Sequence, residues 1–289
     1  MHLARELRGR IDFFRRQAVQ FSFAGAVKLR LINKYNELAV RSKALPHFWP
    51  IIRVRLPGFR YNMYLRTGTS DMDVFRQVFV DREYESVHPR ETVETILDCG
   101  ANVGYTSVYF LNKYPDARVV AVEPDPENAR ICRMNLAPYG DRAQVVVGAV
   151  WSHPATLTLV QNAYRDGRAW ATQVRQMDPE RDCAETSLTA FDIPALMHRL
   201  GCDQVDILKV DIERSEAILF GGACQWLKHV KNIAIELHDA ECERIFFSAM
   251  QPYRFDLEGS GELTICRNIQ LPGERLAPLS TGLLFERLQ

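Results

Sequence analysis

The sequence lacks any apolar run that approaches the roughly 20 residues of a membrane-spanning helix. It also lacks a continuous apolar segment near its N-terminus of the kind found in secretory signals. Its seven cysteines are spread singly, with no C-x-x-C pair and an odd total. That usage argues against a disulfide framework and against a structural zinc site. We therefore expect a cytoplasmic protein with reduced thiols.

The chain has no net charge, but its charges are unevenly distributed. Residues 1–60 hold thirteen Lys and Arg against three Asp and Glu, a charge of +10, which leaves −10 for the remainder. Apolar side chains recur at helical spacing at Leu3, Leu7, Ile11 and Phe14, so residues 1–45 are expected to form a basic helical N-terminal extension.

Two interpretations of this extension stay open. The helix packs on the catalytic domain or on a second subunit of a homo-oligomer, or it contacts an anionic membrane surface or an acidic partner. No nucleic-acid binding motif accompanies the charge, so no nucleic acid partner is expected.

Residues 46–91 are expected to precede the main sheet as a hairpin and a helix. The apolar runs at 51–56 and 60–65 flank a Pro-Gly pair, which is typical of a hairpin turn. A helix is expected over 72–80, with Ser70 as its N-cap. Residues 92–289 then form the catalytic domain.

A strand, a tight loop and a helix start follow one another at residues 93–111. The apolar run stops at Asp98, and the chain then turns through Gly100 and Gly104. Glycines leave the backbone open to a ligand, and a helix start favours a carboxylate. Asp98 adds an acceptor for an ammonium group. The candidate cofactor residues here are Asp98, Gly100, Asn102, Gly104 and Thr106.

Glu123 closes a second apolar run at 118–122, nineteen residues after the loop's second glycine. An acidic residue at this point is placed to accept hydrogen bonds from the ribose hydroxyls of a nucleoside. The D-x-G-x-x-x-G pattern puts Asp98 where it would repel a pyrophosphate, so S-adenosylmethionine fits better than NAD. Arg66 and Asp71 are further candidates for closing the cofactor pocket.

A third buried strand is expected over 144–150, followed by an insertion at 151–190. Two alternating stretches in this insertion, 157–160 and 169–174, indicate a hairpin over the strand ends. Such loops usually select the substrate. The side chains suited to a polar substrate are Tyr164, Arg165, Arg168 and Trp170; a solvated hairpin tip is the alternative.

The second chemical stretch is a pair of strands with polar ends. A fourth strand is expected to end at Asp211, with Lys209 on the same face, and a fifth over 232–237 ends beside His238. Cofactor and substrate meet at the carboxyl ends of strands in open α/β sheets. Here His238 is the candidate general base on a hydroxyl, and Asp211, Glu236 and His238 are alternatively ligands of a divalent metal. Purely structural ion pairs of Lys209 are the third possibility.

Four stretches together resemble the FkbM family of S-adenosylmethionine-dependent methyltransferases: 96–107, 122–124, 207–216 and 235–238. The similarity spans roughly residues 60–240. It implies an α/β class I (Rossmann-like) fold, a mostly parallel seven-stranded sheet with helices on both faces and its last strand antiparallel. It also implies O-methylation, often of sugar hydroxyls. Arg214 departs from the family, which usually has glycine after the glutamate of its K-x-D-x-E-G-x-E signature.

The functional hypothesis is O-methyl transfer from S-adenosylmethionine to a small-molecule or glycan hydroxyl. Its catalytic candidates are His238, Asp211 and Lys209. An NAD-dependent oxidoreductase and a non-catalytic scaffold that keeps the cofactor pocket are the competing classes. The acceptor itself is left open between glycans, glycolipids and natural products.

Overall fold

The computed structural model describes residues 31, 34, 35, 51–160, 173–178 and 187–271. The basic N-terminal extension lies outside these residues apart from three helical positions, as do Tyr164, Arg165, Arg168 and Trp170 and the last apolar run at 282–285. Within the described parts, no helix is long and apolar enough to cross a membrane.

The core is the seven-stranded sheet that the sequence predicts. Its strands are β3 (Thr95–Cys99), β4 (Arg118–Glu123), β5 (Ala143–Val147), β10 (Ile207–Val210), β11 (Ile233–Glu236), β12 (Arg254–Ser260) and β13 (Leu263–Gln270). Their order across the sheet is β12-β13-β11-β10-β3-β4-β5. The last strand, β13, runs antiparallel to both β11 and β12, whereas β11, β10, β3, β4 and β5 are mutually parallel. This is the expected class I arrangement.

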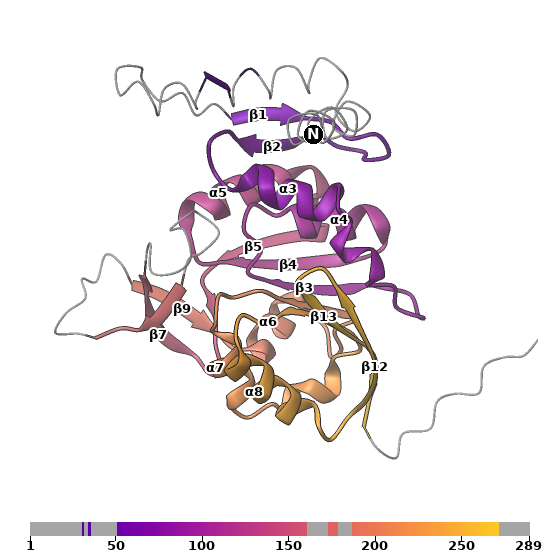
Figure 1. The fold of residues 1–289 in the computed structure, drawn as a ribbon, viewed down its shortest axis with the longest axis vertical. Coiled ribbons are helices and arrows are strands. Elements are labelled where there is room, and N and C mark those ends of the chain that lie inside the picture. The colour runs from indigo at the N-terminus through magenta and orange to yellow at the C-terminus, as the bar shows by residue number, and fades with distance from the viewer. Residues whose placement is uncertain (1–30, 32–33, 36–50, 161–172, 179–186, 272–289) are drawn as a thin grey trace, which may run out of the picture.

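Helices cover both faces of this sheet because successive strand residues point to opposite sides. Ile96 packs in one hydrophobic cluster with Val108 of α4 (Tyr105–Lys113), together with α3 (Asp71–Phe79) and α5 (Pro126–Leu136). Leu97 packs in another with Leu196 of α6 (Ile193–Leu200) and Phe246 of α8 (Ala240–Met250), beside α7 (Glu216–Gly221). Figure 1 shows α3 and α5 near the top of the molecule and α7 and α8 near the bottom.

The predicted hairpin before the core is confirmed as β1 (Ile51–Val54) paired antiparallel with β2 (Met63–Arg66). Ile52 and Leu65 are buried in the same cluster as Ile96. The hairpin is therefore seated on the catalytic domain and shares its hydrophobic core.

Ser70 occupies the N-cap position of α3, as predicted, but its side chain does not cap the helix. Ser70 has helical dihedral angles and makes no side-chain capping hydrogen bond to α3. The neighbouring hydroxyl of Thr69 instead accepts a hydrogen bond from the backbone N–H of Asp71 at 3.2 Å. Ser70 is 1% exposed, so burial rather than capping accounts for its position.

The single strand predicted over 144–150 is wrong, because the chain leaves the main sheet at Gly148. β5 ends at Val147, and β6 (Ala149–Val150) joins a second sheet of order β6-β9-β7-β8. A Cβ on Gly148 would lie 2.6 Å from the ring of Phe191 and 2.8 Å from the carbonyl oxygen of Thr189. Only glycine permits this close crossing between the two sheets.

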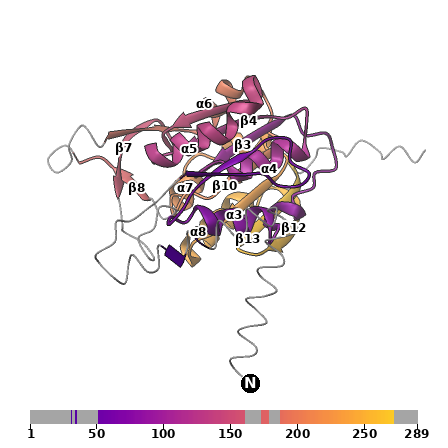
Figure 2. The same ribbon diagram turned by 90° about the horizontal axis from the view of Figure 1, so that it is seen from above.

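The small sheet carries the insertion expected after the third strand. β7 (Ala155–Val160) pairs antiparallel with β8 (Gln173–Gln176) and with β9 (Ser187–Phe191). The hairpin is thus confirmed, with its second strand described from Gln173 onward. It projects to one side of the main sheet, as both views show (Figures 1 and 2).

Candidate active site

The glycine loop joins β3 to α4 and is held against the end of β4. The backbone N–H groups of Gly100 and Ala101 both donate to the carbonyl of Val122, at 2.9 Å each. Asn102 adopts a left-handed conformation with φ of 50°, and α4 begins directly after Gly104. The strand, loop and helix start are therefore as the sequence predicts.

The two glycines of the loop are required by different neighbours. A Cβ on Gly100 would lie 1.7 Å from the carbonyl oxygen of Asp211, and one on Gly104 would lie 2.8 Å from the Sγ of Cys132. Both glycines also have φ above 80°. The loop thus lies between the end of β10 and α5. Gly100 also lines the candidate cofactor cleft, whereas Gly104 packs against α5.

Glu123 ends β4 with its carboxylate 4% exposed and engaged by three donors. These are the backbone N–H of Asn102 at 2.8 Å, the backbone N–H of Asp125 at 3.0 Å and the side-chain amide of Asn128 at 3.3 Å. Burial raises the pKa of Glu123 to about 7, against the three hydrogen bonds, which lower it. The glycine loop, through Asn102, is therefore hydrogen-bonded directly to Glu123, the predicted ribose-binding residue.

Asn128 connects Glu123 to the segment before the core. Arg66 donates to Asn128 Oδ1 at 2.6 Å and makes a two-pronged ion pair with Asp71, at 2.7 and 3.0 Å. Asp71 is fully buried. Arg66 and Asp71 thus support the residue that holds Glu123, one layer away from the cleft.

Asp98 lies under the glycine loop, beside Lys209. Its side chain is fully buried, accepts a 2.6 Å hydrogen bond from Ser107 and pairs with Lys209 Nζ at 3.3 Å. Lys209 also donates to the carbonyl of Gly100 at 2.5 Å and lies 3.6 Å from Asp211. The direct contact predicted between Asp98 and the cofactor ammonium stays a prediction; in this structure Asp98 anchors the lysine under the glycine loop.

Lys209 is a fixed cation and not a proton carrier. Burial lowers its pKa, but the carboxylates of Asp98 and Asp211 outweigh that effect and hold the pKa above the usual lysine value. The role in catalysis that remains for Lys209 is electrostatic: its charge stabilises the carboxylate of Asp211 and the carbonyl of Gly100.

A single cleft of about 560 Å³ brings the remaining predicted residues together. That volume is typical of a small-molecule site. Its lining includes Gly100, Asn102, Thr106, Glu123, Lys209 and Asp211. Asp73, Gln77 and Tyr84, from the segment before the core, line it as well. A carboxylate beside a backbone loop at a helix start suits the ribose and amino-acid ends of S-adenosylmethionine.

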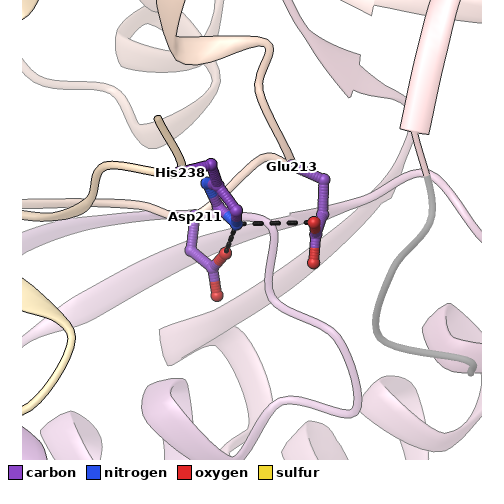
Figure 3. A group of neighbouring side chains, drawn as sticks. All are labelled: Asp211, Glu213 and His238. Atoms are coloured by element: carbon purple, nitrogen blue, oxygen red, sulfur yellow. Dashed lines mark ion pairs between the residues drawn. The ribbon is translucent and has the colours of Figure 1, made fainter. Parts of the chain in front are cut away.

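At one end of this cleft, His238 stands among four carboxylates. Its Nε2 lies 3.4 Å from Glu213, 3.5 Å from Glu236 and 3.7 Å from Asp211. Its Nδ1 faces Glu216 at 3.2 Å. Figure 3 shows the His238 ring directed at Asp211 and Glu213. His238 lies in the loop after β11, and the two carboxylates follow β10. The predicted adjacency of β10 and β11 is confirmed, with Val210 opposite Ile235.

The base role predicted for a solitary His238 does not suit this environment. The side chain is 1% exposed and does not line the cleft. Burial lowers its pKa, but Glu216, then Asp211 and Glu236, outweigh burial and raise it to about 9. Without a bound cation, a ring with this pKa is mostly protonated at neutral pH and then cannot accept a proton from a hydroxyl.

Sequence reasoning missed two members of the cluster. Glu213 and Glu216 stand in the 207–216 stretch, but neither was predicted to be a site residue. The structure buries Glu216 completely, and its Oε1 accepts a 2.8 Å hydrogen bond from the backbone N–H of Ile212. The spacing of Asp211 and Glu213, two residues apart directly after a strand, is the signal that could have identified Glu213.

Arg214 stands where the family pattern has glycine, and its φ is +76°. Its guanidinium pairs with Asp239 at 2.6 Å on the half-exposed surface. Glycine adopts this conformation without the cost of roughly 1–2 kcal/mol that other residues carry. An exposed ion pair contributes only about 0–1 kcal/mol in return.

We therefore expect Arg214→Gly to leave the free energy of unfolding unchanged or to raise it by up to about 1 kcal/mol. Arg214→Val, which puts a β-branched side chain at the same φ, should lower it by about 2 kcal/mol or more. Denaturant unfolding of both variants measures the difference. Equal losses in the two would mean that the ion pair, and not the backbone, governs this turn.

Comparison with known proteins gives the chain its family. The model of the Methyltransferase FkbM domain matches residues 98–258. The 2-O-methyltransferase NoeI of Sinorhizobium fredii is 26% identical over 187 residues, which cover 61% of this chain and 74% of NoeI. The AMB antimetabolite synthetase AmbE of Pseudomonas aeruginosa is 29% identical over 201 residues, which cover 57% of this chain but 9% of AmbE.

Among solved structures, the FkbM methyltransferase of Methylobacillus flagellatus KT aligns with a TM-score of 0.45 and 16% identity, covering 63% of this chain and 45% of that one. The family match decides between the two cofactors that the loop pattern left open. Since that match extends over more than half of its length, the chain belongs to the FkbM family of methyltransferases, which use S-adenosylmethionine.

Proposed function

We propose that the chain transfers a methyl group from S-adenosylmethionine to a hydroxyl oxygen, that of a sugar in a glycan, glycolipid or natural product. The observation that carries the proposal is one cleft lined by both Glu123 and Asp211. A nucleoside-binding carboxylate and a second carboxylate at a neighbouring strand end suit two reactants side by side. The name of NoeI, a 2-O-methyltransferase, supports an oxygen acceptor.

Glu123 would hold the ribose, and the loop from Gly100 to Asn102 with Thr106 the amino-acid end. When bound, the cofactor supplies a methyl group on a positively charged sulfur. Holding this methyl and a hydroxyl in line supplies much of the acceleration, because a positioned pair reacts as one molecule.

Asp211 is the cleft residue best suited to the acceptor hydroxyl. Its side chain is 32% exposed, and its two oxygens face different partners, Oδ2 toward Lys209 and Oδ1 toward His238. A carboxylate fixed in this way accepts the hydrogen bond of the hydroxyl and orients its lone pair. The proton acceptor proposed here is thus Asp211, with the imidazole as its support.

The acceptor would enter from the side of the small sheet. Ala149 and Val150 of β6 and Val174 of β8 line the cleft there. Contact of the basic N-terminal extension with an anionic membrane, and self-association of the chain, remain proposals from the sequence.

The first test is titration of the full chain with S-adenosylhomocysteine, with NAD run in parallel. We expect micromolar binding of the former and none of the latter. Next, incubation with S-adenosylmethionine carrying a ¹³C-labelled methyl and a panel of glycosides, lipid-linked sugars and alcohols should give a product whose label is bonded to oxygen. A label found only on nitrogen or carbon would refute the proposal.

Cofactor affinity should fall as the pH is lowered through 7. Ribose hydroxyls donate to ionised Glu123, whose pKa burial raises to about 7 in the free protein, so binding must remove a proton below that pH. We expect the dissociation constant of S-adenosylhomocysteine to rise nearly tenfold per pH unit below about pH 7. Calorimetry at about pH 6 and pH 8 measures this change.

The control is Glu123→Gln, which keeps the shape and lacks the titrating group. It should bind more weakly at every pH and show no change of affinity across neutrality. A wild-type affinity that is the same at both pH values would mean that Glu123 does not contact the ribose as an anion.

A further inference from the structure

We infer that the ends of β10 and β11 form a site for one divalent cation of the Mn²⁺ class. The ligands lie at the end of β11 or in the turns that follow the two strands: they are carboxylates of Asp211, Glu213 and Glu236 and the Nε2 of His238. The ion itself is inferred from these donors alone. Its role in the reaction rests on the proposed function.

The spacing of the donors is the first argument. His238 Nε2 lies 3.4 to 3.7 Å from one oxygen of each carboxylate. Donor atoms of Asp211, Glu213 and His238 all lie within 4.8 Å of one another. Neighbouring ligands of a cation with bonds of roughly 2.1–2.5 Å are about 3.0–3.5 Å apart. The atoms of Asp211, Glu213 and His238 are therefore spaced as ligands around a shared centre, and Glu236 lies 3.5 Å from Nε2 beside them.

The second argument is the state of the imidazole. His238 is 1% exposed, yet its Nε2 makes a hydrogen bond to none of the three carboxylates around it. A single N–H can point at one acceptor, whereas this nitrogen faces both Asp211 and Glu213 (Figure 3) and lies 3.5 Å from Glu236 as well. A buried ring nitrogen without a hydrogen bond needs another partner. A metal ion among these carboxylates is such a partner.

The other ring nitrogen supplies the support that metal-binding histidines normally have. Nδ1 faces the Oε1 of fully buried Glu216 at 3.2 Å, and that oxygen is itself anchored by the backbone N–H of Ile212. A carboxylate facing Nδ1 favours the ring proton on that nitrogen and the lone pair on Nε2 once an ion is bound; without one, neither nitrogen makes a hydrogen bond in this structure. Glu216 thus supports the imidazole from one side while the acidic ligands face its other nitrogen. This is the usual arrangement of a metal-binding histidine and its supporting carboxylate.

Charge and ligand type indicate the class of ion. Of the three ligand carboxylates, that of Asp211 is paired with Lys209 at 3.6 Å. A divalent ion would offset most of the remaining negative charge. Carboxylates suit Mg²⁺, Ca²⁺ and Mn²⁺, while an imidazole favours a transition metal, so the mixed set points to Mn²⁺.

In the proposed reaction, the acceptor hydroxyl would occupy the side of the ion open to the cleft, beside half-exposed Asp211. Coordination lowers the pKa of a bound hydroxyl. Its proton passes to solvent by way of Asp211, its oxygen forms the new bond to the methyl carbon, and the electrons of the carbon–sulfur bond remain on sulfur. S-adenosylhomocysteine and a methyl ether are the products.

The test is titration of the chelator-treated full chain with MnCl₂, with free Mn²⁺ followed by electron paramagnetic resonance. We expect one Mn²⁺ bound per chain. Glu213→Gln, which is isosteric, should weaken binding at least about tenfold, as loss of a ligand does. Glu262→Gln, which changes an exposed acid of the same cleft outside the cluster, should leave the affinity within about twofold. S-adenosylhomocysteine binding by each variant establishes that it is folded.

No stoichiometric binding at millimolar Mn²⁺, or equal affinity in wild type and Glu213→Gln, would overturn the site. Displacement of Mn²⁺ by an equal concentration of Mg²⁺ or Ca²⁺ would overturn the assigned class. Failure of O-methyl transfer with every acceptor, with Mn²⁺ binding intact, would instead reject the proposed function and leave the metal site standing. A second variant, His238→Asn, should weaken Mn²⁺ binding as Glu213→Gln does.

Discussion

Lys209→Met is expected to lower the free energy of unfolding by about 3–5 kcal/mol, because it leaves a charged group buried without its partner. Lys209 and Asp98 are 3% and 0% exposed and lie 3.3 Å apart in the middle of the sheet. With the lysine removed, Asp98 keeps its hydrogen bond to Ser107 but loses its only ion pair among the described residues. Urea unfolding measures the loss.

Two further variants separate this explanation from simple loss of packing. Asp98→Asn combined with Lys209→Met removes both charges, so the double variant should be more stable than Lys209→Met alone. Arg130→Met, which breaks an exposed pair with Glu127, should change stability by less than about 1 kcal/mol. A double variant less stable than the single would show that Asp98 does not need the lysine.

Gly100→Ala should abolish cofactor binding and lower the free energy of unfolding by about 3 kcal/mol or more, through strain and overpacking together. The new Cβ would lie 1.7 Å from the carbonyl oxygen of Asp211 and 2.8 Å from its carbonyl carbon. Both are backbone atoms at the end of β10, so neither can turn aside. The glycine loop or the strand end must move, and both line the cleft. Thermal unfolding and titration with S-adenosylhomocysteine measure the two effects.

Gly140→Ala is the matched control. Gly140 also has positive φ, +58°, but no atom lies within 4 Å of its added Cβ. Its substitution therefore carries the conformational cost alone, about 1–3 kcal/mol. The difference between the two variants isolates the contact with Asp211. Equal losses would mean that the loop can relax away from β10.

The sequence predicts the main sheet well, since its strands are short apolar runs with polar ends. Helix α5 is found as expected at Pro126–Leu136, where Asp125 caps the first turn and Pro126 opens it. The ends of three strands could also be predicted, because Asp98, Glu123 and Asp211 each interrupt an apolar run. The positions of Glu123 and Asp211 in one cleft follow from that reading.

The partners of buried polar groups were not predictable in the same way. Asp98 is buried under the glycine loop, whereas Glu123 lines the cleft. The neighbouring sequence does not distinguish the two carboxylates, because the orientation of Asp98 depends on Lys209, its ion-pair partner on the adjacent strand β10. Glu216 resembles any first-turn helix acid until α8 and His238 are packed over it. The break at Gly148 has the same cause, since it is imposed by Phe191, more than forty residues further along the chain.

The ion pair of Arg66 and Asp71 has a thermodynamic consequence for the whole N-terminal half of the described chain. Through Asn128, these residues reach the carboxylate that is proposed to hold the ribose. A ligand that binds more tightly to Glu123 then also stabilises the packing of β2 and α3 on the core. The coupling free energy between the two is the same in both directions. Amide hydrogen exchange in Met63–Phe79 becomes a gauge of cofactor occupancy, and a chain cut back to residue 92 would lose affinity although it keeps Glu123 and the glycine loop.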